Sequence, residues 1–129
     1  MRTKIKQKGY LAEKVVKDKL KKYFYIPQKG ISTKGVDIVA LNKYLALVIE
    51  VKSFSNYLKI KKEQIKNLFE EERKIKEFFD IPVLKIVALV KNKEIKYCKV
   101  EKEEELKINE EKFKELNEFD YFLLLKEIE

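Results

Sequence analysis

Apolar residues near the start of the chain recur at spacings of three and four, with lysines between them. Side chains at these spacings lie on one face of an α-helix. We therefore expect an amphipathic helix over residues 8–23, with a strongly basic polar face. Its apolar positions are Leu11, Ala12, Val15, Val16, Leu20 and Tyr23. Residues 23–26 are a short strand candidate that Pro27 ends, and the Gly, Ser and Thr of residues 28–35 indicate a loop.

Two apolar runs follow, at residues 36–41 (VDIVAL) and 45–54 (LALVIEVKSF), separated by the turn-like residues 42–44. Adjoining runs of this kind form a β-hairpin. The second run is apolar on both faces for several residues, which is typical of an interior strand.

The second half of the chain predicts another helix and more strands. Residues 61–79 have helical periodicity, and Pro82 keeps that helix from continuing. Its apolar stripe comprises Ile65, Leu68, Phe69, Ile75 and Phe79. Residues 83–90 indicate a buried strand, and 94–100 alternate as a half-exposed partner does.

Near the end of the chain, residues 101–112 are mostly charged. A short helix is predicted over residues 109–118. The apolar run at 121–125 is either a last strand or an oligomer contact. The order α-β-β-β-α-β-β predicts an α/β fold, with a mixed central sheet and a helix on each side. At 129 residues the chain has the size of one domain, so we expect residues 1–129 to form a single domain.

Composition narrows the function classes. The chain has no His, which excludes Ser-His triads, His-metal nucleases and HEXXH proteases, and its single Cys, Cys98, excludes disulfides and cysteine zinc cages. We expect a cytoplasmic protein without a membrane segment or a signal peptide. A net charge of +8 from dispersed lysines suits an anionic partner such as nucleic acid, although thermophile proteins without such a partner have similar surfaces.

Asp37, Glu50 and Lys52 form the candidate chemical centre. Glu50 and Lys52 are two residues apart on one strand, so they project from the same face, and hairpin pairing brings Asp37, one residue into its strand, alongside Glu50. Burying an unpaired carboxylate is unfavourable, but a divalent cation reverses that effect. Hard oxygen ligands suit Mg²⁺, so we expect this ion as the cofactor and no small-molecule cofactor.

A bare Glu-x-Lys triplet is weak evidence in a chain so rich in Glu and Lys. The most serious decoy is Asp80 with Glu94 and Lys96, which repeats nearly the same interval. Asp80 follows a predicted helix and Glu94 follows a turn, where carboxylates are solvated. Only Asp37 and Glu50 are embedded in adjoining apolar strands.

Four motifs together resemble the archaeal Holliday-junction resolvases of the PD-(D/E)XK superfamily. They are KGYLAE at 8–13, GVDIVAL at 35–41, LVIEVKS at 47–53 and IPVLKIVALV at 81–90, and the resemblance covers about residues 6–100. It implies a restriction-endonuclease-like fold and a dimeric, Mg²⁺-dependent endonuclease that nicks two opposed strands of a four-way DNA junction. Residues 101–129 are an extension of uncertain role.

The resemblance also implies roles for single residues. Asp37 and Glu50 match its metal-binding carboxylates and Lys52 its catalytic lysine; the backbone carbonyl of Val51 would be a further metal ligand. Glu13 matches the acidic residue of the first helix, and independently it borders the apolar face there. The number of metal ions, one or two, remains open.

The loop matches the family less closely. Ser32 and Lys29 are the nearest counterparts of its serine and basic residue, and Thr33 competes with Ser32. Lys14 stands where the family usually has arginine, and a lysine lacks the bidentate fork that arginine offers a phosphate. The expected DNA-binding residues are Lys4, Lys6, Lys8, Lys14, Lys29 and Lys34.

A homodimer would present one centre to each of two equivalent strands. The candidates for the dimer contact lie on the second predicted helix, although aromatic residues at helical spacing more often belong to the core. They are Phe69, Ile75, Phe78 and Phe79. Other functions stay open beside the resolvase: a repair or restriction nuclease, a non-catalytic nucleic-acid-binding protein, and a charged structural protein.

Overall fold

The computed structural model describes residues 2–28, 35–53, 58–108 and 114–115. Helix α1, Arg2–Leu20, opens the chain. It ends before Tyr23, the predicted limit, because the backbone N–H groups of Tyr23 and Phe24 both donate to the Leu20 carbonyl and turn the chain. Phe24 is thereby placed in the core. The prediction of a helix to Tyr23 was wrong by three residues, since the buried side chain of Phe24 outweighs local periodicity.

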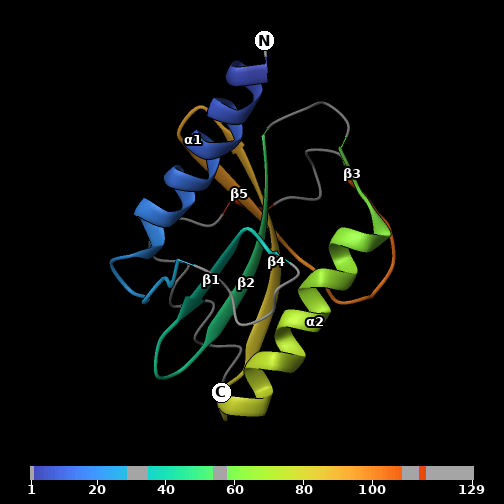
Figure 1. Ribbon diagram of the computed structural model, residues 1–129. Helices are drawn as coiled ribbons and strands as arrows, with labels where there is room; N and C mark the ends of the chain where they lie inside the picture. Colours follow the sequence, from blue (N-terminus) through green and yellow to red (C-terminus); the bar gives the residue numbers. More distant parts are fainter. Residues whose placement is uncertain (1, 29–34, 54–57, 109–113, 116–129) are drawn as a thin grey trace.

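A mixed sheet lies between two helices, as the sequence predicted, with α1 to its left and α2 to its right in Figure 1. Its strand order is β1-β2-β4-β5-β7, and only the β2–β4 pair is parallel. The strands are β1 Ile38–Leu41, β2 Ala46–Ser53, β4 Val83–Lys91, β5 Glu94–Lys99 and β7 Lys114–Glu115. Parallel neighbours need a crossover. Strand β3 (Leu58–Ile60) and helix α2 (Lys62–Phe78) supply it.

Alternate side chains of β2 fill two separate cores. On the α1 side, Leu47 and Ile49 pack with Val16 and Leu20. On the α2 side, Val48 packs with Ile65, and Leu68 belongs to the same cluster. Strand β2 is therefore buried on both faces, as predicted for an interior strand.

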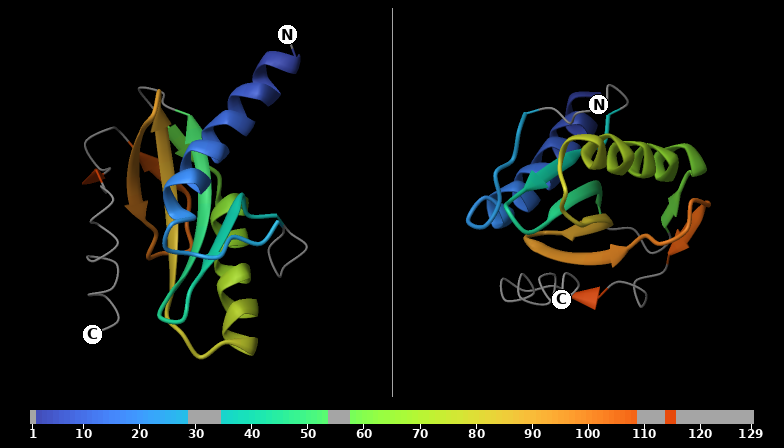
Figure 2. Two further views of the ribbon diagram at one scale, coloured as in Figure 1. Left: turned by 90° about the vertical axis from the view of Figure 1, so that its left-hand side faces the viewer. Right: turned by 90° about the horizontal axis from the view of Figure 1, so that it is seen from below.

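Two local predictions were wrong. Residues 23–26 form no strand; Tyr25 makes a single bridge with Leu41, because only their backbones exchange hydrogen bonds. Residues 109–118 are not all helical, since Lys114–Glu115 is β7, paired with Lys96 and Tyr97 of β5. The charged stretch, for which no element was predicted, contains β6 (Leu106–Ile108), and this strand pairs with β3 just before α2 (Figure 2). The apolar run at 121–125 lies outside the described residues.

Helix α2 buries Ile65, Leu68 and Ile75 as predicted, but its stripe does not include Phe79, which is 43 % exposed. Phe79 lies beyond the last helical residue in extended backbone, so the helical period no longer applies to it. Glu71 lies on the buried side instead. Neither helix of the described chain is long and apolar enough to cross a membrane.

A largely buried ion pair joins α2 to β4. Lys85 Nζ lies 2.8 Å from Glu72 Oε2, with the two side chains only 11 % and 16 % exposed. The same ammonium lies 4.6 Å from the centroid of the Phe69 ring. Removing one member of such a pair leaves the other charge poorly solvated.

We expect Glu72→Ala to lower the free energy of unfolding by about 1 to 3 kcal/mol, measured by urea denaturation. Glu77→Ala is the matched control, because the Glu77–Lys74 pair is 56 % and 53 % exposed. It should change stability by less than about 0.5 kcal/mol. Equal effects of the two substitutions would contradict the role assigned to the Lys85 pair.

Candidate active site

Asp37 stands immediately before β1, not inside it as predicted, because strand pairing stops at Ile38 and Ile49. Its carboxylate takes over where the ladder ends: Oδ2 accepts the backbone N–H of Val51 at 2.7 Å. This bond holds Asp37 against β2 at Val51, beyond the residues of β2 that pair with β1. The register also brings Asp37 beside Glu50, as the hairpin predicted.

Glu50 lies on the interior strand β2 and is only 7 % exposed. Its neighbours Ile49 and Val51 pack on the α1 side, so Glu50 projects toward α2. There its Oε1 lies 3.5 Å from Lys52 Nζ and accepts a hydrogen bond of 3.3 Å from Gln64 Nε2. The expected common face of Glu50 and Lys52 is confirmed.

Burial and the Asp37 charge raise the pKa of Glu50 to about 7, and Lys52 opposes the shift. Burial also raises the pKa of Glu13 on α1, helped by the Asp37 charge and by a hydrogen bond between the two carboxyl groups, while Lys17 lowers it. Glu13 and Glu50 thus both interact with Asp37, from opposite sides of the sheet. The Asp37 carboxylate therefore repels both of these glutamates.

The donor set fits a divalent cation in its chemistry. Asp37, Glu50 and Glu13 offer hard oxygen atoms, and a positive ion would offset the burial and the repulsion that raise the pKa of Glu13 and Glu50. Within the described ranges, no three His, Cys, Asp or Glu side chains already stand as a metal cage. The carboxyl groups are coupled pairwise through Asp37, so a cation would have to draw them together.

The other predicted site residues are placed unevenly. Lys14 is exposed on α1. Lys4, Lys6 and Lys8 lie on the same helix, in the part where the structure describes the backbone alone. The loop residues Lys29, Ser32, Thr33 and Lys34 lie outside the described residues.

The decoy residues Asp80 and Glu94 are exposed, as predicted, and they do not join the buried carboxylates. The candidate dimer residues divide into two kinds. Ile75 is core and Phe69 packs against it, whereas Phe78 and Phe79 are exposed.

Sequence reasoning missed Gln64. Its place three residues after Lys61, at the start of a predicted helix, is the spacing of a capping interaction, and this was the available signal. Its contact with Glu50 depends on how α2 packs on the sheet, which periodicity does not specify.

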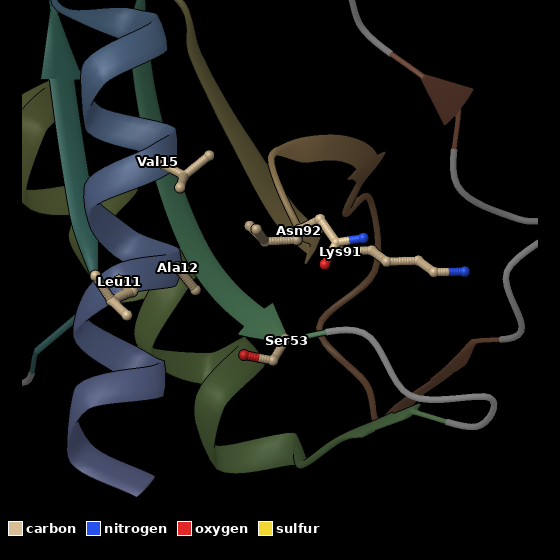
Figure 3. Close-up of a pocket in the computed structure, with 7 residues that line it drawn as sticks. Leu11, Ala12, Val15, Ser53, Lys91 and Asn92 are labelled. Atoms are coloured by element: carbon tan, nitrogen blue, oxygen red, sulfur yellow. The ribbon is translucent and has the colours of Figure 1, made fainter. Parts of the chain in front are cut away.

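A mainly apolar pocket of about 310 Å³ lies between α1 and the ends of β2 and β4. Figure 3 shows Ala12 and Val15 on α1, Ser53 at the end of β2, and Asn92 in the turn after β4. Its lining includes neither Asp37 nor Glu50. The pocket is therefore separate from the carboxyl cluster.

The raised pKa of Glu50 has a definite effect on stability. Because the folded-state value of about 7 exceeds the ordinary 4.5, the fold favours the protonated carboxyl. This stabilisation is complete below pH 4.5 and is lost as the pH rises through 7.

We therefore expect Glu50→Gln, which cannot ionise, to be more stable than the wild type at pH 8 in EDTA. The difference should shrink from at most about 3 kcal/mol to near zero at pH 4.5, when measured by urea denaturation. A difference that does not change with pH would show that ionised Glu50 is not destabilising.

Comparison with known proteins shows a likeness to solved structures, but not to sequences. No family model matches this chain, and no curated protein matches its sequence. Among solved structures, it is similar to Hjc, a Holliday junction resolvase from the archaeal hyperthermophile Archaeoglobus fulgidus. The TM-score is 0.64 at 23 % identity, covering 82 % of this chain and 87 % of that one. With its mixed sheet and flanking helices, the chain has a restriction-endonuclease-like fold.

Proposed function

We propose that the chain is an Mg²⁺-dependent endonuclease that resolves four-way DNA junctions by paired nicks. The observation that carries the proposal is the convergence of Asp37, Glu50 and Lys52 in a buried strand pair, with Glu13 approaching from α1. The fold shared with Hjc, which is a Holliday junction resolvase, favours this substrate over other DNA.

In this proposal Asp37, Glu50 and Glu13 hold the metal through carboxylate oxygens, and the Val51 carbonyl is a further ligand. Bound Mg²⁺ supplies Lewis acidity at the phosphodiester and lowers the pKa of a coordinated water. Lys52 orients the attacking water or offsets charge on the phosphate, because its ammonium is already held beside Glu50. Ser32 or Thr33 contributes a loop hydroxyl.

Binding of branched DNA would rest on backbone contacts and not on base sequence. The positive charge of +8 favours phosphate binding in general. Lys4, Lys6, Lys8 and Lys14 all belong to α1, the helix that also carries Glu13, so their helix would lie along the DNA. Lys29 and Lys34 would act from the loop. A two-fold homodimer would place one such site on each of two equivalent strands.

We expect the wild type to nick a synthetic four-way junction in Mg²⁺ at two symmetric positions and to be inactive in EDTA. Glu50→Gln should reduce the cleavage rate at least about 100-fold while junction binding persists, because the substitution removes one charged metal ligand. Glu94→Gln is the matched control, because exposed Glu94 repeats the Glu-x-Lys pattern outside the site. This variant should cleave the junction at the wild-type rate.

Linear duplex of equal length separates the related functions. Equal cleavage of both substrates would indicate a nuclease with a different task, and binding without cleavage would indicate a nuclease-fold binding protein. Failure to bind either DNA at moderate salt would contradict the proposal altogether.

Lys14 offers a test of the DNA-binding surface. We expect Lys14→Ala to weaken binding of junction DNAs of different sequence by a similar factor. It should also reduce the slope of log affinity against log salt by about 1, as the loss of one phosphate contact does. Lys74→Ala removes an exposed lysine from α2, on the opposite face of the sheet, and serves as the control. Equal slopes for the two variants would show that Lys14 makes no specific phosphate contact.

A further inference from the structure

The side-chain amide of Gln64 makes two hydrogen bonds with opposite polarity. Its Oε1 accepts the backbone N–H of Lys61 at 3.3 Å, and its Nε2 donates to Glu50 Oε1 at 3.3 Å. If the amide were rotated by half a turn, its oxygen would face the Glu50 carboxylate and its NH₂ group would face the Lys61 N–H, so both hydrogen bonds would be lost. The helix start therefore fixes which end of the amide faces Glu50.

Glu50 receives two donors on the same oxygen. Lys52 Nζ lies 3.5 Å from Oε1, the atom that Gln64 Nε2 also contacts. The last torsion of a glutamate side chain is broad when it is left free. Two donors from different elements, β2 and α2, restrict that rotation and set the plane of the carboxylate.

The position of Gln64 is in turn fixed by the packing of α2. Ile65, which follows it, and Leu68, one turn later, are fully buried against the sheet. Gln64 also belongs to the first turn of α2, where the positive end of the helix dipole favours a carboxylate. The helix thus brings a rigid donor to strand β2.

We propose that Gln64 is a positioning residue of the site, whose amide holds the Glu50 carboxylate in the orientation that binds the divalent cation. The inference rests on the proposed function. Partners that orient a metal-binding side chain commonly change metal affinity about 10- to 100-fold when they are removed.

The test measures Mn²⁺ binding to the DNA-free protein by isothermal titration calorimetry. Gln64→Met keeps the length of the side chain and a high helix propensity but removes both hydrogen bonds. We expect its Mn²⁺ dissociation constant to rise about 10-fold or more. The Mn²⁺ concentration needed for half-maximal junction cleavage should rise by a similar factor, with junction binding unchanged. Gln64→Ala, an even stronger helix former, should behave alike.

Glu63→Gly controls for damage to the helix. It weakens the same first turn of α2 through glycine's flexibility, and Glu63 is exposed. Urea denaturation should show that Glu63→Gly is at least as destabilised as Gln64→Met, yet it should bind Mn²⁺ like the wild type.

The two proposals fail in different ways. Wild-type affinity in Gln64→Met, or an equal loss in Glu63→Gly, would overturn the positioning role while the proposed function stands. A wild type that binds no Mn²⁺ at the carboxylates would overturn the proposed function and the positioning role together.

Discussion

The burial of Glu50 in the interior strand β2 is the constraint on which the rest of the site depends. Strand β2 lies between β1 and β4 and is covered on both faces, so a carboxylate there is largely removed from water. An isolated charge in such a place is strongly unfavourable. Lys52 and Gln64 offset part of that penalty with donors, whereas the nearby charge of Asp37 adds to it. A group that remains destabilised in the protein alone is suited to binding a cation.

The topology explains how distant residues reach this one strand. The parallel β2–β4 pair requires a crossover, and that crossover ends in α2, whose first turn lies over Glu50. On the other face, α1 packs on β2 and brings Glu13 toward Asp37. Asp37 interacts with both sides because it stands immediately before β1, where its carboxylate accepts the Val51 N–H. The site is therefore defined by α1 and α2, on opposite faces of the sheet, and by the start of β1.

Sequence patterns predicted the elements whose burial follows a simple period. The hairpin, α2, β4 and β5 were confirmed, because alternation and helical spacing persist over several residues in each. The end of α1 and the pairing of β3 with β6 were not predictable in this way, since they depend on the burial of Phe24 and on contacts between distant short segments. Asp37 and Glu50 were identified from charge within apolar strands. Gln64 was not, because only the packing of α2 brings it to Glu50.

The most direct test of the account is a crystal structure of the protein with Mn²⁺, in which anomalous scattering locates the metal. The account predicts a peak bound by the carboxylates of Asp37 and Glu50, with the Glu50 carboxylate still contacted by Gln64 and Lys52. A fully occupied metal elsewhere, with Asp37 and Glu50 still joined only to their protein partners, would contradict the claim that this buried pair is the catalytic metal site.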